Sequence, residues 1–291
     1  MINKLLFTFL ISILLVGCNL QQADQSKEIL TVSIAPQKYF IERLIGDTID
    51  VNIMIPQGSD HATYAPSATQ IKKLSKSVAY LKMGHLGFES VWVEKIQSAN
   101  PNLKWFDMSN GISTIHGDHS HHHHDHDHIC SAGVDPHIWT SPKEVQQIIK
   151  NTRQYLVELF PQHKGVIASN YELLMSELDE MDERLKTVAS RNPNLAFMIF
   201  HPAYTYLAQA YGFEQITIEF EGKTPTPGRL KTTIENAREK QIKTIYIQQE
   251  FDQSNALVIA KEIGATTVQV NPLDEQWKNE MERFINYLET Q

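Results

Sequence analysis

The sequence is poor in cysteine and has no excess of positive charge. Its 291 residues include two cysteines, too few for a disulfide scaffold or for a structural zinc site of the cysteine type. Its 26 lysines and arginines are outnumbered by 34 aspartates and glutamates, and the net charge of -8 argues against a nucleic-acid-binding protein. Hydrophobic residues make up 42% of the chain, enough to bury the cores of about two domains.

A hydrophobic run long enough to cross a bilayer is also missing. The apolar run 5–16, which follows Lys4, has twelve residues, whereas a membrane-spanning helix needs ~20. Residues 1–17 are therefore predicted to be a signal peptide. They end in a sequence that resembles a bacterial lipobox, so Cys18 is expected to become the acylated first residue of the mature protein. A polar tether over residues 19–28 follows. The alternative is an ordinary signal peptide with an incidental cysteine.

Short β-rich runs alternate with helical stretches along the rest of the chain, a pattern that predicts two similar α/β lobes with mostly parallel sheets. The N-terminal lobe is predicted over residues 29–160 and the C-terminal lobe over residues 191–291. The predicted strands are residues 29–34, 50–55, 78–83, 104–106, 195–200, 215–220, 244–248 and 267–270. The predicted helices of the two lobes include residues 38–45, 68–77, 88–98, 203–211, 229–240, 255–263 and 277–288.

A long helix is predicted to join the two lobes within residues 161–190. Its helical part, 166–189, has an apolar seam spaced by three and four residues, formed by Leu174, Leu178, Met181 and Leu185. At 1.5 Å per residue, ~24 helical residues extend ~36 Å, too long for one small lobe. We therefore predict a rigid backbone helix and, between the lobes, a cleft at the carboxyl ends of the strands, where α/β sheets bind ligands.

Three histidines are placed to hold a metal in that cleft. His61, His137 and His201 each lie in a segment that leads into a helix, which should expose them at the cleft rim. A lone histidine at such a junction is usually structural, but three in an exported protein favour a tetrahedral zinc site with one further ligand. His85, also near a junction, is a secondary candidate expected to be structural, and His163 is expected to be solvated.

Eight further histidines form a low-complexity stretch between residues 116 and 128. They are His116, His119, His121, His122, His123, His124, His126 and His128. The stretch has no large apolar residue to bury, so it cannot contribute to a core. Its imidazoles are expected to bind several zinc ions weakly and to lose them near pH ~6.5, which suggests a loop that collects or senses zinc. The alternative is an inert surface insertion. If Cys18 is acylated, Cys130 has no partner for an intramolecular disulfide.

Four motifs, in this order, give the chain a family resemblance. They are GSDH ending at His61 with YAPS behind it, DPHIW around His137, HPAY beginning at His201, and NPL beginning at Asn271. From residue 29 onward the chain resembles the ZnuA-like periplasmic metal-binding components of zinc and manganese ABC transporters. The resemblance implies two α/β lobes, a long linking helix and a metal buried between the lobes. The implied protein is a monomeric, lipid-anchored component of the bacterial cell envelope, periplasmic or on the outer face of the cytoplasmic membrane. It would capture Zn²⁺ and deliver it to an ABC permease.

The resemblance also implies a ligand set. His61, His137 and His201 match the family's three nitrogen-donor positions, whereas manganese members tend to carry glutamate at the position of His201, so imidazole there favours Zn²⁺. The fourth ligand stays open. Many relatives have aspartate or glutamate where this chain has Asn271, a poor uncharged ligand, and the donor could instead be Asp60 or water.

Other functions remain as alternatives. The protein could be a manganese-binding homologue, or a surface adhesin whose metal is only structural. A zinc hydrolase would need a general base near the metal, such as Asp60 or Glu221. The sequence has no His-Glu-x-x-His motif or related signature, so we expect no enzymatic activity.

Overall fold

The computed structural model describes residues 27–116, 133–219, 225–251 and 253–291. The predicted signal peptide, Cys18, Cys130, Glu221 and the histidines from His119 to His128 lie outside the described residues. Within the described residues, no helix is both long enough and apolar enough to span a bilayer.

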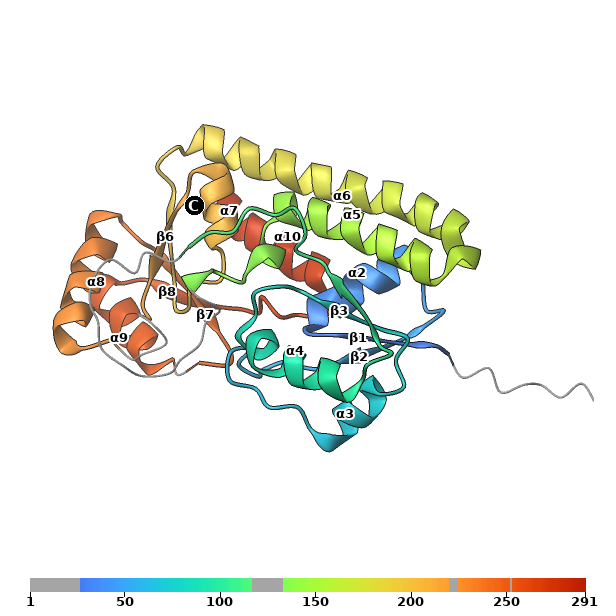
Figure 1. The fold of residues 1–291 in the computed structure, drawn as a ribbon. Helices are drawn as coiled ribbons and strands as arrows, with labels where there is room; N and C mark the ends of the chain where they lie inside the picture. Colours follow the sequence, from blue (N-terminus) through green and yellow to red (C-terminus); the bar gives the residue numbers. More distant parts are fainter. Residues whose placement is uncertain (1–26, 117–132, 220–224, 252) are drawn as a thin grey trace, which may run out of the picture.

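Two four-stranded parallel sheets form the framework (Figure 1). The N-terminal sheet contains β1 (Ile29–Val32), β2 (Asp50–Ile53), β3 (Ala79–Lys82) and β4 (Lys104–Asp107) in the order β2-β1-β3-β4. The C-terminal sheet contains β5 (Ala196–Ile199), β6 (Glu214–Thr217), β7 (Thr244–Gln248) and β8 (Thr266–Val270) in the equivalent order β6-β5-β7-β8. The prediction of two similar α/β lobes with parallel sheets is confirmed.

Helices follow the strands in both lobes. The N-terminal lobe carries α2 (Ala35–Ile45), α3 (Ala68–Leu74) and α4 (Gly87–Ala99). The C-terminal lobe carries α7 (Thr205–Tyr211), α8 (Pro227–Glu239), α9 (Ser254–Ile263) and α10 (Trp277–Glu289). Between these two sets of elements along the chain come the short 3-10 helices η2 (Ile138–Thr140) and η3 (Pro161–His163) and the helices α5 (Pro142–Leu159) and α6 (Lys164–Arg191). Figure 1 shows α6 running along one side of both lobes, with α5 beside it.

The predicted apolar seam of the long helix is the face of α6 that the protein buries. Its four seam residues are each no more than 3% exposed. They belong to one hydrophobic cluster that also contains Val32 of β1 and Ile199 of β5, so a single core continues from one lobe to the other. A second, smaller cluster lies against the C-terminal sheet, with residues from α8 and α9.

The C-terminal helix α10 returns to the N-terminal lobe. The ring of Trp277 lies edge-on to Phe40 of α2, with 5.1 Å between the ring centroids. The Trp277 indole also donates a hydrogen bond of 2.7 Å to the carbonyl of Trp139, and the Trp139 indole donates one of 2.8 Å to the carbonyl of Pro272. These contacts tie η2 and both lobes together through buried aromatic side chains.

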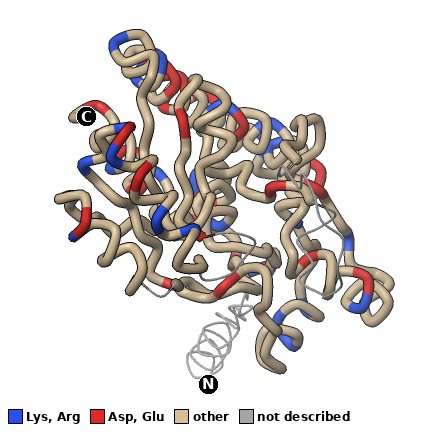
Figure 2. Tube along the Cα trace, turned by 90° about the vertical axis from the view of Figure 1, so that its left-hand side faces the viewer, with Lys and Arg blue, Asp and Glu red and all other residues tan. Residues whose placement is uncertain are grey.

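Charged side chains are distributed over both lobes. Figure 2 shows acidic and basic positions interspersed along the helices in the described part of the chain. Several form ion pairs between elements, such as Arg43 of α2 with Glu177 of α6 at 2.8 Å and Arg184 of α6 with Glu289 of α10 at 2.8 Å. The charges of α6 therefore help to fix the helices that lie against it.

Candidate metal centre

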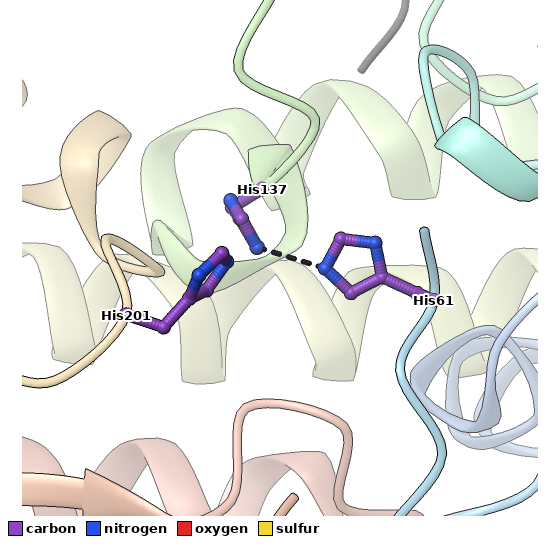
Figure 3. Close-up of side chains that lie close together, drawn as sticks. All are labelled: His61, His137 and His201. Carbon is purple, nitrogen blue, oxygen red and sulfur yellow. Dashed lines mark hydrogen bonds between the residues drawn. The ribbon is translucent and has the colours of Figure 1, made fainter. Parts of the chain in front are cut away.

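The structure brings three of the predicted site residues together between the lobes. His61 lies in the loop between β2 and α3, His137 immediately precedes η2, and His201 follows β5. One ring nitrogen of each lies within 4.8 Å of those of the other two, and the Nε2 atoms of His61 and His137 are 3.1 Å apart. Figure 3 shows the three rings turned toward one another.

The spacing of these nitrogens suits a small tetrahedral cation. Zinc–imidazole bonds of about 2.0–2.1 Å put the nitrogens of a tetrahedral site ~3.3 Å apart. The observed separation of 3.1 Å between the His61 and His137 nitrogens is close to that value. The three ring nitrogens all lie within 4.8 Å of one another, so the third imidazole needs to move inward only slightly to bind the same ion. The three donors therefore fit a single ion.

Two of the histidines are oriented by buried carboxylates. The Nδ1 atom of His137 donates to Asp135 at 2.9 Å, and the Nδ1 atom of His201 donates to Glu219 at 3.0 Å. A carboxylate on Nδ1 fixes the proton there and leaves the Nε2 lone pair free, which is the arrangement found behind metal-ligating histidines. His137 Nε2 is consequently the acceptor of its contact with His61, whose Nε2–H donates.

The remaining nitrogens of the cluster lack partners. Nε2 of His201 and Nδ1 of His61 are buried and have no hydrogen-bond partner. An unpaired buried polar atom is costly, and it marks a place where a ligand can restore the missing interaction. A cation bound by the three Nε2 atoms would satisfy His201 and would displace the proton that His61 shares with His137.

The surroundings of the cluster shift the pKa values of His61 and Asp135 in the direction that favours cation binding. Burial, together with the neighbouring His137 and His201, holds the pKa of His61 well below its usual range, so His61 stays neutral. Burial alone would raise the pKa of Asp135, but its interactions with His137, which include hydrogen bonds from the ring and from the backbone N–H, outweigh burial and lower it. A histidine held neutral in this way binds a metal ion without first having to lose a proton.

The histidines are less exposed than the sequence predicted. His61 and His137 are 8% and 4% exposed, whereas a position on the cleft rim was expected. Aromatic rings lie against the cluster: the ring centroids of Trp139 and His137 are 5.2 Å apart, and Phe251 stacks on His201 with 4.9 Å between centroids. The side chain of His201 remains 20% exposed and is the most accessible of the three.

The loop that carries His61 is fixed at both ends of its motif. Gly58 adopts a φ of 75°, a left-handed conformation that favours glycine. The carboxylate of Asp60 accepts from the backbone N–H of Ala62 at 2.8 Å and from the hydroxyl of Thr63 at 2.9 Å. The carbonyl of His61 accepts from the N–H of Phe88 in the first turn of α4 at 3.1 Å. The backbone of this motif thus holds the imidazole in place.

Both protein candidates for the fourth ligand are occupied elsewhere. Both oxygens of Asp60 accept the turn bonds of its own loop. The amide of Asn271 donates to Asp274 at 3.1 Å and accepts from the N–H of Leu273 at 3.3 Å. Neither residue belongs to the metal-type cluster found among the described residues.

The other histidines lie apart from the cluster. His85 occupies a loop with a positive φ of 64°, and burial lowers its pKa. His163 is the last residue of η3, directly before α6, and is partly exposed. His116 is exposed and forms a β-bridge with Val134 at the edge of the histidine-rich stretch, whose other histidines are outside the described residues.

Sequence reasoning missed the orienting carboxylates. Asp135 stands in the DPHIW motif two residues before His137, and this spacing could have suggested its role. Glu219 was included in a predicted strand over residues 215–220, but β6 ends at Thr217, so Glu219 lies in the following loop. Its partnership with His201 depends on the pairing of β5 with β6, which places Ile199 opposite Thr217.

Comparison with known proteins places the chain among zinc-uptake components. The family model ZnuA, described as "Zinc-uptake complex component A periplasmic", matches residues 30–291. The high-affinity zinc uptake system protein ZnuA of Bacillus subtilis (strain 168) is 27% identical over 263 residues, covering 87% of this chain and 81% of that protein. The zinc-binding lipoprotein AdcA of Streptococcus pneumoniae (strain R6) is 26% identical over 296 residues, covering 98% of this chain. The chain spans 58% of the length of AdcA.

Solved structures agree with these sequence matches. A crystal structure of ZnuA superimposes with a TM-score of 0.81 at 31% identity, covering 91% of this chain and 98% of that one. A zinc-bound deletion mutant of ZnuA superimposes with a TM-score of 0.79 at 31% identity, covering 90% of this chain and 97% of that one. Both the two-lobe fold and the parallel sheets therefore have solved counterparts.

Proposed function

The chain belongs to the ZnuA family of periplasmic zinc-uptake components, and from this membership we propose that it captures Zn²⁺ outside the cytoplasmic membrane and delivers it to an ABC permease. The family is one of transport components rather than enzymes. We propose that this chain likewise has no catalytic activity. The observation that carries the proposal is the convergence of His61, His137 and His201 at one buried point, with ring nitrogens within 4.8 Å of one another.

The donor set favours zinc over manganese. Imidazole nitrogen suits Zn²⁺, whereas Mn²⁺ prefers carboxylate, carbonyl and water oxygens. The cluster offers three imidazoles, and the carboxylates of Asp135 and Glu219 accept hydrogen bonds from the histidines. One Zn²⁺ bound by the three Nε2 atoms would keep one coordination position for a further ligand, as in open tetrahedral zinc sites.

Binding between the lobes suits a carrier that must also release its cargo. His61 comes from the N-terminal lobe and His201 from the C-terminal lobe, while His137 precedes η2. A permease that moves the segment holding one histidine would remove one of the three nitrogens and weaken the site. We propose that the protein acts as a monomer in this exchange, anchored to the membrane through acylated Cys18.

The histidine-rich stretch from His116 to His128 is proposed as an accessory element. Its closely spaced imidazoles would bind several zinc ions, each more weakly than the site formed by His61, His137 and His201. Such a stretch raises the amount of zinc held near the tight site when the metal is scarce. It would not replace the ligands fixed by the fold.

The experiment that tests the function is a metal titration of the purified protein against a competing chelator. We expect one tight Zn²⁺ site that Mn²⁺ does not occupy at equal concentration. His61→Ala, His137→Ala and His201→Ala should each weaken this site by at least about 100-fold, because one of three protein ligands is lost. His163→Ala is the matched control and should bind as the wild type does. Equal affinities in all four variants, or equal competition by Mn²⁺, would contradict the proposal.

A further inference from the structure

One histidine and two glutamates occupy equivalent places at the carboxyl edge of the C-terminal sheet. His201, Glu219 and Glu250 each stand two residues beyond the end of a strand, namely β5, β6 and β7. These strands are neighbours in the order β6-β5-β7, so the positions converge at one edge of the sheet. His201 and Glu219 already have roles in the site described above. Glu250 has none.

The loop that carries Glu250 is attached to His201 on both sides of the glutamate. Gln248 accepts from the N–H of His201 at 3.2 Å and donates to its carbonyl at 2.8 Å. Phe251 stacks on the imidazole with an angle of 23° between the rings. Glu250 stands between these two contacts, so its backbone position is set relative to the imidazole of His201.

The same loop also meets the N-terminal lobe at the motif of His61. The side chain of Gln249 packs close to Gly58: its Nε2 atom lies 3.6 Å from the position that a Cβ atom would occupy on this glycine. The loop after β7 therefore lies between a histidine of one lobe and the histidine-bearing loop of the other.

Glu250 is half-buried, and one of its carboxylate oxygens is buried without a partner. Its Oε2 atom has no hydrogen-bond partner. Burial raises the pKa of Glu250, the negative charge of Asp60 adds to this, and the charge that His201 can carry opposes it. These influences place the carboxylate within electrostatic reach of both residues. A buried carboxylate oxygen without a donor or cation is unfavourable, and a metal centre beside it would remove the penalty.

The carboxylates and the amide already described around the site have partners. Asp135 and Glu219 accept from imidazoles, and Asp60 and Asn271 are engaged in their own turns. Glu250 is not among the atoms that lie within 4.8 Å of one another in the histidine cluster. We therefore assign the carboxylate no direct bond to an ion held by the three histidines and consider contact through a bridging water molecule instead.

Resting on the proposed zinc-binding function, we propose that Glu250 completes the site from outside the first coordination shell. Its Oε2 accepts a hydrogen bond from the water bound at the fourth position of the zinc, and its negative charge balances the ion. Outer-shell carboxylates of this kind are worth about 10- to 100-fold in metal affinity. Glu250 is thus a positioning residue for the fourth ligand, and Asp60 and Asn271 keep their structural bonds.

The test compares Glu250→Gln with Glu235→Gln, which removes the same charge from an exposed position on α8 of the same lobe. Zinc affinity is measured by chelator competition, and thermal unfolding is measured without metal. We expect Glu250→Gln to bind zinc about 10- to 100-fold more weakly. Its metal-free melting temperature should not fall, because the variant no longer buries an unpaired carboxylate. Glu235→Gln should match the wild type in both measurements.

A cobalt-substituted sample separates an outer-shell role from direct ligation. If the carboxylate acts through water, the visible absorption of bound Co²⁺ keeps its four-coordinate character in Glu250→Gln while the affinity falls. A change of coordination number, or zinc affinity within threefold of the wild type, would overturn the inference. A lower metal-free melting temperature with unchanged affinity would also overturn it, by assigning Glu250 a merely structural role. Absence of tight zinc binding in the wild type would instead refute the proposed function itself.

Discussion

Replacement of Glu219 by glutamine should weaken zinc binding without disturbing the fold. In the wild type, the Glu219 carboxylate accepts from Nδ1 of His201 at 3.0 Å, which leaves Nε2 unprotonated and able to bind metal. The amide of glutamine can present its NH₂ group to Nδ1 instead. That arrangement favours the tautomer with the proton on Nε2, which cannot bind a cation.

The size of the effect follows from the role of this contact. Loss of a carboxylate behind a metal-bound histidine costs about 10- to 100-fold in affinity. This factor corresponds to about 1.4–2.7 kcal/mol. Zinc-dependent stabilisation of the folded protein should fall by the same amount at saturating metal, because only the folded state binds the ion. Asp135 would be a poorer test, since it also accepts from the backbone N–H of His137 at 2.8 Å.

The assay is a chelator-competition titration of the wild type, Glu219→Gln and the surface control Glu235→Gln, with thermal unfolding of each protein with and without zinc. Glu235 pairs with Lys231 on the exposed face of α8, so its variant controls for the loss of one negative charge. Zinc affinity of Glu219→Gln within threefold of the wild type would refute the role assigned to the carboxylate. A large loss of metal-free stability would show that Glu219 is mainly structural.

Three further outcomes can be measured on the same protein. Trp139→Phe should lower the free energy of unfolding by about 1–3 kcal/mol in urea denaturation, because the carbonyl of Pro272 loses its buried donor. Burial raises the pKa of Glu89 from 4.5 to about 7, so the folded state binds the extra proton in that window. The stability of the wild type relative to Glu89→Gln should therefore decrease by roughly 3 kcal/mol as the pH rises from 4 to 8, measured by urea denaturation. Deletion of residues 117–128 should leave one tight zinc site in a chelator titration and remove the additional weak sites.

The repeating features of the fold could be predicted from the sequence because they depend on local patterns. Alternation of β-rich and helical runs predicted two parallel sheets, and the two sheets have equivalent strand orders. The seam from Leu174 to Leu185 predicted the buried face of α6 by spacing alone. Helix starts were less accurate. α8 begins at Pro227, two residues before the predicted start, because the hydroxyl of Thr226 caps the N–H of Arg229.

The cluster of three histidines could be proposed from their positions at junctions, but their environment could not. The pairing of His201 with Glu219 requires β5 and β6 to be neighbours in register, which is a tertiary property. The packing of His61 against Trp139, and of His201 against Phe251 in the loop after β7, likewise brings together residues that are distant in the sequence. The sequence identifies the three histidines, but it does not show which residue forms a hydrogen bond with each ring nitrogen.

The continuous core limits how this site can open. Phe40, Trp139 and Trp277 are each no more than 2% exposed, and they join α2, η2 and α10 across the lobes. A wide hinge motion would expose them, and an aromatic side chain that buries about 150–250 Å² costs roughly 4–6 kcal/mol at about 25 cal/mol per Å². Exposing all three would cost as much as the whole stability of an ordinary domain. Metal exchange is therefore expected to proceed through local movement around His201, the most accessible of the three histidines, rather than through separation of the lobes.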